Sequence, residues 1–163
     1  MDAYTAIRTK RDTRDYLDKP IDSDAKARIL QAGRMAGSST NKQPYHFIVI
    51  ESQDQRTAIS GCGNHMTHAE QSPLVVAIAM PDDHTLFDAG RAAQNMMVAA
   101  WELGISSCPV VTHDTECSSL VLGVPQGMLV RYVVTFGYPP DAAKVGAGRA
   151  RKPMDEILHS ERW

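Results

Sequence analysis

Hydrophobic residues along this chain form two patterns, one typical of helices and the other of strands. After Asp22, apolar residues recur at helical spacing, and Asp22 or Ser23 is a residue type that caps a helix. Short unbroken runs of β-branched and aliphatic residues predict strands instead. The expected strands cover 47–50, 74–80, 105–111 and 129–136. The other expected helices cover 2–9, 53–60, 84–103, 112–122 and 154–159, with a loop over 137–153.

The order of these elements mixes helices and strands without a regular strand–helix–strand alternation. Such an order favours a layered α+β fold. The chain has 163 residues, a length that suits one domain, and no linker, repeat or low-complexity tract interrupts it. We therefore expect a single domain over 1–163.

The helix expected over 84–103 is apolar over most of its circumference. Its polar residues fall on one narrow stripe, so neighbours must cover it on several sides. A subunit interface explains this pattern in so small a chain. A central core helix within one subunit is the alternative.

Composition narrows the classes of function. Lys and Arg number 17 and Asp and Glu number 19, a net charge of −2, which argues against general binding to nucleic acid. The longest apolar run, 74–80, is too short to cross a membrane. The first residues lack the basic and apolar regions of a secretion signal, so we expect a cytoplasmic protein.

The cysteines and histidines suggest little metal or disulfide chemistry. Cys62, Cys108 and Cys117 are odd in number and form no CxxC pattern, so neither a disulfide framework nor an iron–sulfur site is expected. Cys62, His65 and His68 have a spacing that places three metal ligands on one helical face. Gly61 and Gly63 weaken a helix there and no fourth ligand is evident, so a loop with a short helix is the preferred interpretation and no metal site is predicted.

Two basic clusters lie near opposite ends of the chain. Lys10, Arg11 and Arg14 form the first, and Arg149, Arg151 and Lys152 form the second. Arginine pairs with phosphate through a planar fork of donors. On spacing alone, a solvated basic turn paired with Asp12, Asp15 and Asp18 is the preferred interpretation of the first cluster, and an exposed tail is the alternative for the second.

A polar loop, 38–44, joins an expected helix to an expected strand. Its hydroxyl and amide side chains suit the edge of a heterocycle that alternates donors and acceptors, although an ordinary connection would look the same. The chain contains no nucleophile elbow, Walker loop, G-x-G-x-x-G or H-E-x-x-H motif. If the protein is an enzyme, we expect a bound cofactor to carry the chemistry and no side chain to be the catalytic nucleophile or base.

Several motifs, in the same order, resemble those of the FMN-dependent nitroreductase family. Residues 7–16 are similar to its arginine-rich phosphate motif, and 36–44 to its Ser-x-x-Asn-x-Gln-Pro motif. Residues 88–109 are similar to its central helix and the strand after it. Three shorter matches, at 122–125, 136–139 and 151–156, complete the order.

This resemblance implies an α+β fold with a mostly antiparallel central sheet flanked by helices, in a homodimer with FMN sites built from both subunits. It implies a two-half-reaction (ping-pong) mechanism, in which NADH or NADPH reduces FMN and the flavin then reduces a nitro compound, quinone or similar small acceptor. The implied FMN-binding residues are Lys10, Arg11, Asp12, Arg14, Ser38, Ser39, Asn41, Gln43, Pro109, Val110, Val111, Thr112, Arg149 and Arg151.

The chain departs from the family pattern at three places. Asp12 replaces a common serine and is expected to face a ribityl hydroxyl or Arg14, since a carboxylate repels phosphate. Gly37 replaces a proline, and Val111-Thr112 replaces Glu-Gly. A flavin carrier or sensor without turnover is the alternative function, and a dimeric domain that has lost its cofactor is a third.

Overall fold

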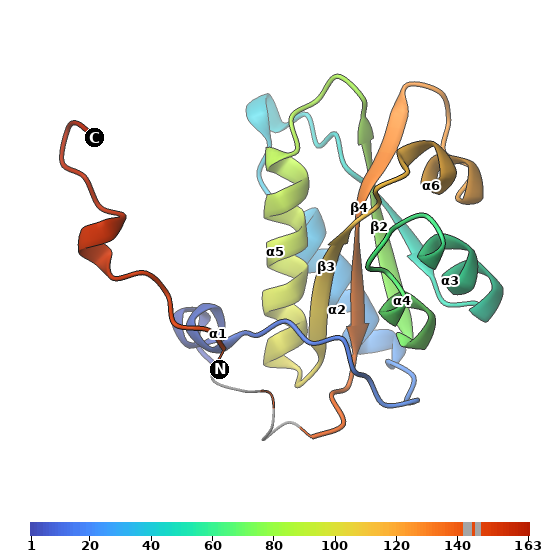
Figure 1. Cartoon of the computed structure of the whole chain (residues 1–163), viewed down its shortest axis with the longest axis horizontal. Helices are drawn as coiled ribbons and strands as arrows, with labels where there is room; N and C mark the ends of the chain where they lie inside the picture. Colours follow the sequence, from blue (N-terminus) through green and yellow to red (C-terminus); the bar gives the residue numbers. More distant parts are fainter. Residues whose placement is uncertain (142–144, 146–147) are drawn as a thin grey trace.

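A four-stranded antiparallel sheet lies at the centre of the structure (Figure 1). Its order is β1-β2-β4-β3, so β3 is an edge strand. The computed structural model describes residues 1–141, 145 and 148–163. The strands are β1 (His46–Ile50), β2 (Leu74–Pro81), β3 (Ser106–Val111) and β4 (Met128–Gly137).

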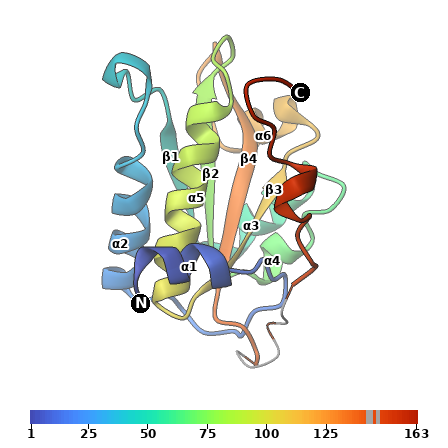
Figure 2. The same ribbon diagram turned by 90° about the vertical axis from the view of Figure 1, so that its left-hand side faces the viewer.

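Helices cover both faces of this sheet. On one face lie α2 (Ser23–Arg34) and α5 (Phe87–Glu102), with α1 (Ala3–Thr9) beside α5 (Figure 2). On the other lie α3 (Gln53–Ser60), α4 (His68–Gln71) and α6 (Thr115–Val121). The predicted α+β fold with an antiparallel sheet is thus confirmed.

The central strand β2 reads as an unbroken apolar run because both of its faces are buried. Successive side chains of a strand point to opposite faces. Leu74, Val76 and Ile78 join the core under α2 and α5, whereas Val75 and Ala77 join the core under α3 and α6.

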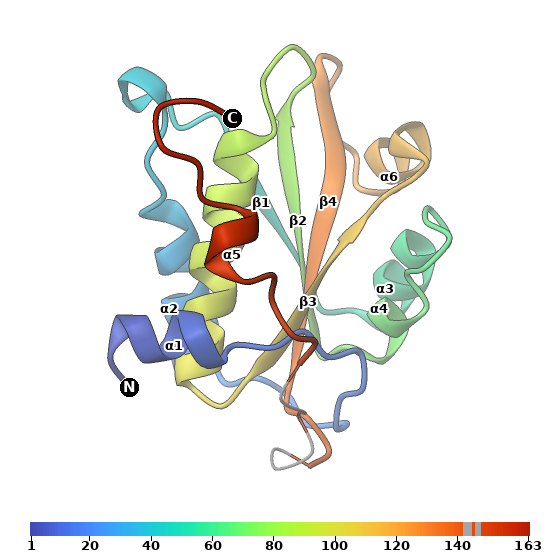
Figure 3. The ribbon, with the colours of Figure 1, turned by 60° about the vertical axis from the view of Figure 1, so that its left-hand side comes forward.

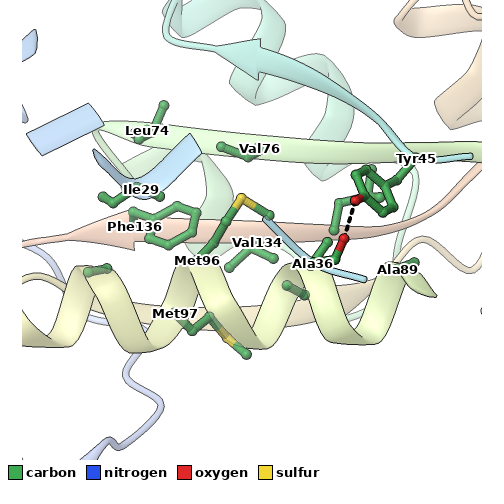
Figure 4. Packing of buried hydrophobic residues seen from close by; sticks show 14 of the residues in the cluster. Ile29, Ala36, Tyr45, Leu74, Val76, Ala89, Met96, Met97, Val134 and Phe136 are labelled. Atoms are coloured by element: carbon green, nitrogen blue, oxygen red, sulfur yellow. Dashed lines mark hydrogen bonds between the residues drawn. The ribbon is translucent and has the colours of Figure 1, made fainter. Parts of the chain in front are cut away.

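Met96 of α5 lies at the middle of the first core (Figure 4). It packs among buried side chains of α2 and of the sheet, and Gly33 of α2 leaves room for its thioether. At the end of this core, the Tyr45 hydroxyl donates a hydrogen bond to the Ala36 carbonyl across 2.5 Å. This bond holds the backbone that leads into the polar loop against the core.

The long helix α5 is a core helix within its own chain, with six buried residues. This matches the alternative interpretation of its apolar pattern. The opposite face is exposed over the first turns of the helix and carries Phe87, a residue that is 71% exposed. A second subunit is therefore not needed to explain the helix, but one face of it is open to a partner.

Most predicted elements are present, with shifted ends. The helix expected from 112 begins at Thr115 instead, because the Asp114 carboxylate caps it by accepting from the Cys117 N–H. The helix expected from 84 begins at Phe87. The loop with a short helix that the sequence predicts is present, and its helix is the four-residue α4.

The expected final helix over 154–159 is wrong. A single 3₁₀ turn, Met154–Glu156, takes its place in a segment that extends away from the sheet and helices (Figure 1). Residues 149–163, here called the C-terminal arm, are exposed throughout, so no packing stabilises a longer helix. Of the loop expected over 137–153, residues 142–144 and 146–147 lie outside the described residues.

Cys62 and Cys117 form a disulfide, which the sequence did not lead us to expect. Their Cα atoms are 5.5 Å apart although 55 positions separate them in sequence, so no local spacing signals the pair. The disulfide also uses Cys62, one of the three residues whose spacing resembles a metal site, and the described residues contain no cluster of metal ligands. Cys108 is a free, buried thiol. No helix in the described ranges is long and apolar enough to cross a bilayer.

Candidate functional site

Residues 10–14, here called the basic segment, run along the outer edge of β3. Asp12 forms a parallel bridge with Ser107, and the Thr13 N–H donates to the Ser107 carbonyl across 3.2 Å. The Lys10 ammonium pairs with the Asp12 carboxylate and lies 3.4 Å from the Met97 sulfur of α5. The edge of the sheet and α5 therefore fix this segment in place.

Within the chain, Asp12 does not face Arg14, one of the two groups expected for it. Its carboxylate pairs with Lys10 and not with Arg14. Because this pair neutralises two of the four charges, Arg11 and Arg14 carry the net positive charge of the segment. The Arg11 guanidinium donates to the carbonyls of Arg8 and Lys10 at 3.0 and 2.8 Å.

The end of β3 presents one backbone donor outward. The Thr112 N–H donates to the Arg131 carbonyl across 3.0 Å, and its buried hydroxyl donates to the Val130 carbonyl. Because N–H groups alternate in direction along an antiparallel strand, the Val110 N–H also faces β4. Pro109 has no N–H, as suits an edge position. Among residues 109–112, Val111 therefore carries the outward N–H.

The second basic cluster begins beside the first. Gly148 lies so close to Arg11 that a Cβ atom built on Gly148 would be 2.4 Å from the Arg11 Nε atom. Its φ of +75° also favours glycine. Arg149 and Arg151 follow in the exposed arm. Residues near both ends of the chain thus meet at Arg11.

The polar loop lies elsewhere in the chain. Its backbone has positive φ at Thr40, Asn41 and Gln43, and the Ser38 hydroxyl accepts from the Gln43 N–H across 2.7 Å. The loop begins near the first turns of α5, whereas the basic segment contacts its later turns (Figures 1 and 3). One chain therefore does not bring Ser38, Ser39, Asn41 and Gln43 to the basic segment.

The position of Gly37 explains one departure from the family pattern. A Cβ atom on Gly37 would be 2.4 Å from the Arg91 Nη2 atom of α5. The glycine thus lets this guanidinium lie against the backbone directly before the polar loop.

A cavity beside Arg14 contains residues that the sequence interpretation did not assign to a site. It has a volume of about 450 Å³. The residues lining it are Arg14, Asp15, Asn64, His65, Thr67, His68 and Gln71. Asn64 and His65 belong to the segment first considered as a metal pattern, so its density of polar residues was the available signal.

His68 is the most enclosed residue of this cavity, with 6% of its surface exposed. Burial and the nearby charge of Arg14 lower the pKa of its imidazole. Its Nε2 atom is buried and has no hydrogen-bond partner among the described residues. The neutral ring is therefore favoured at neutral pH.

Comparisons with known proteins agree with this geometry. The nitroreductase family model matches residues 7–82 and 62–138. A protein of Archaeoglobus fulgidus named "Putative NADH dehydrogenase/NAD(P)H nitroreductase" is 32% identical to this chain. The alignment covers 96% of each of the two chains.

Solved structures share the fold at lower identity. An FMN-dependent nitroreductase of Clostridium difficile has a TM-score of 0.86 at 21% identity, over 98% of this chain and 99% of that one. An NADPH:FMN oxidoreductase of Vibrio harveyi, solved with NAD+, has a TM-score of 0.89 at 18% identity, over 99% and 77%. The family model, the Archaeoglobus relative and the shared fold together show that this chain belongs to the nitroreductase family.

Proposed function

We propose that the protein is an FMN-dependent oxidoreductase that uses NADH or NADPH to reduce nitro compounds, quinones or similar acceptors. One observation carries the proposal: the basic segment is fixed along the edge of β3, the strand whose end presents the Val111 N–H outward. A site with cations at one end and a backbone donor at the other suits a phosphate joined to a heterocycle.

The donor set fits FMN. In this proposal Arg11 and Arg14 bind the phosphate, joined by Arg149 and Arg151 of the arm. Lys10 supports the segment through its pair with Asp12. The Val111 N–H donates to the edge of the isoalloxazine ring, and the amide of Asn64 lines the cavity beside Arg14. The names of the Clostridium and Vibrio proteins support the same cofactor.

The same proposal requires a homodimer. Because the polar loop and the basic segment lie apart in one chain, Ser38, Ser39, Asn41 and Gln43 reach the flavin from a second copy. Two surfaces support such a partner. The outer face of α5 exposes Phe87, and the arm exposes large apolar side chains that a partner would cover. These are Met154, Ile157, Leu158 and Trp163.

The chain's own residues contribute positioning and electrostatics. When bound, FMN would take a hydride from NADH or NADPH and pass two electrons to the acceptor in a separate half-reaction (ping-pong). An outward N–H at Val111 favours negative charge on the ring edge. Cys108 is buried, and burial raises the pKa of its thiol, so a thiolate nucleophile is disfavoured there. We therefore assign no catalytic side chain.

Chromatography of the flavin extracted from the purified protein tests the cofactor. We expect FMN, and FAD or no flavin after supplementation would contradict the proposal. Anaerobic mixing with NADH or NADPH tests turnover, since bleaching of the flavin absorbance marks the first half-reaction. Bound FMN that neither nucleotide bleaches would instead identify a flavin carrier or sensor.

A further inference from the structure

The loop between α3 and α4, residues 61–67, is fastened at its base by the Cys62–Cys117 disulfide. The bond joins this loop to α6, which lies far away in sequence. Cys62 is 1% exposed and packs in the second core, whereas Cys117 is partly exposed. The disulfide is thus anchored on one side and accessible on the other.

Near this bond, three consecutive residues of the loop lie against the last residue of β3 and the segment that follows it. The Cys62 carbonyl accepts from the Asp114 N–H across 3.0 Å, and the Asn64 N–H donates to His113 Nδ1 across 3.3 Å. A Cβ atom on Gly63 would lie 3.0 Å from the Val111 carbonyl oxygen. The loop therefore packs directly against the end of β3.

The same loop borders the proposed flavin site on a second side. Asn64 and His65 line the cavity that Arg14 also lines, and the His65 ring meets the His113 ring with centroids 6.0 Å apart. A change at the base of the loop would therefore reach both Val111 and the neighbourhood of Arg14.

We propose that the Cys62–Cys117 pair is a reversible redox site that controls the affinity of this protein for FMN. In the oxidised form the disulfide orders the 61–67 loop against the end of β3 and α6. In the reduced form fewer constraints hold the loop, and FMN must order it on binding, which lowers the affinity. This inference rests on the proposed function for its ligand.

The chemistry is thiol–disulfide exchange with a dithiol reductant. A thiolate of the reductant attacks the sulfur of Cys117, the more exposed partner, and Cys62 leaves as a thiolate. The second thiol of the reductant then displaces Cys117 and closes the reductant's own disulfide. The protein gains two electrons and two protons, and the dithiol loses the same.

The first experiment counts thiols and measures hydrogen exchange. The protein purified without reductant should react with a thiol reagent at one site per chain after denaturation, namely Cys108, and at three after reduction. Reduction should speed amide exchange in 61–67 and 113–117. Three reactive thiols before reduction, or unchanged exchange, would overturn the proposal whether or not FMN binds.

The second experiment titrates FMN by quenching of its fluorescence in the oxidised and reduced proteins. Reduction should raise the dissociation constant by at least about fivefold, the lower range for coupled sites. Cys62→Ser and Cys117→Ser should bind like the reduced parent and ignore dithiothreitol, whereas Cys108→Ser should respond like the parent.

The outcomes separate the two proposals. Equal FMN affinity in both redox forms, with faster exchange after reduction, would overturn the control of affinity. Absence of FMN binding in both forms would overturn the proposed function and, with it, the assigned ligand. The hydrogen-exchange rates would still show whether reduction loosens the 61–67 loop.

Discussion

The backbone N–H of Thr13 donates a hydrogen bond to the carbonyl of Ser107 across 3.2 Å. This bond joins the beginning of the chain to the free edge of β3, and with it the arginines of the basic segment reach the strand that carries Val111. The proposed site depends on this junction, because it brings the arginines to β3. Spacing in the sequence does not reveal it, since residues 13 and 107 lie far apart in the chain.

Arg14→Ala should weaken FMN binding by about 1.5–3 kcal/mol, the scale of a charge-assisted hydrogen bond. Arg14 lines the cavity beside Asn64 and His68, so its loss removes a cation from the proposed phosphate site. Fluorescence titration with FMN measures the effect. The control is Lys26→Ala, which removes a cation of α2 that pairs with Glu51 at 2.9 Å. Equal affinities in Arg14→Ala and the parent would remove Arg14 from the site.

The stability of the protein should fall when the pH drops below about 6.5, in part because of His68. Burial and Arg14 lower the pKa of this histidine from its ordinary value of 6.5. The unfolded chain therefore binds a proton at a higher pH than the folded chain does, and protonation favours unfolding. Well above pH 6.5 the imidazole is neutral in both states, and the effect vanishes.

Urea unfolding of the parent and of His68→Gln between about pH 5 and pH 8 tests this sign. The parent should lose more stability than the variant on acidification. His46→Gln, at an exposed position of β1, is the control. Its free energy of unfolding should depend on pH as that of the parent does. A His68→Gln variant with the parent's pH dependence would show that this imidazole is not the group responsible.

Much of the fold could be predicted because local patterns determine it. Buried strands such as β2 are continuous apolar runs, and Asp22 caps α2 by accepting from the Ala25 N–H. Local sequence does not fix the start of α6, since Thr112 and Asp114 are both residue types that cap helices and the structure uses Asp114. The final helix predicted over 154–159 does not form, because these residues are exposed and no packed face stabilises a helix there.

The site was predictable in its residue types but not in its arrangement. Arginines and amides can be identified in a sequence, yet the distance between the polar loop and the basic segment depends on where α5 places them. The contact of Gly148 with Arg11 and the Cys62–Cys117 bond join residues far apart in sequence. Neither leaves a local signal.

Reduction of the Cys62–Cys117 disulfide should lower the free energy of unfolding by about 2–4 kcal/mol, because the bond closes a long loop in the unfolded chain. Denaturant unfolding with and without dithiothreitol measures this. The double variant Cys62→Ser, Cys117→Ser should resemble the reduced parent and be insensitive to the reductant. A parent whose unfolding midpoint does not change on reduction would contradict the expected stabilisation.

Phe87→Asp should convert a dimer into a monomer and weaken FMN binding together with it. Phe87 is 71% exposed at the start of α5. The Arg91 guanidinium lies over its ring, with the Arg91 Cζ atom 5.6 Å from the ring centroid. An aspartate at this end of a helix interacts favourably with the helix dipole, so the change should not destabilise α5 itself. A large effect would therefore come from the loss of a partner surface.

Leu120→Asp is the matched control, because Leu120 is 82% exposed on α6, on the opposite side of the sheet. Light scattering at micromolar concentration should give twice the mass of one chain for the parent and for Leu120→Asp, and the single mass for Phe87→Asp. FMN titration of the same samples links assembly to the site, since a monomer lacks the second copy's Ser38, Ser39, Asn41 and Gln43. A parent that is monomeric and still binds FMN would refute the shared site, because one chain holds the polar loop and the basic segment apart.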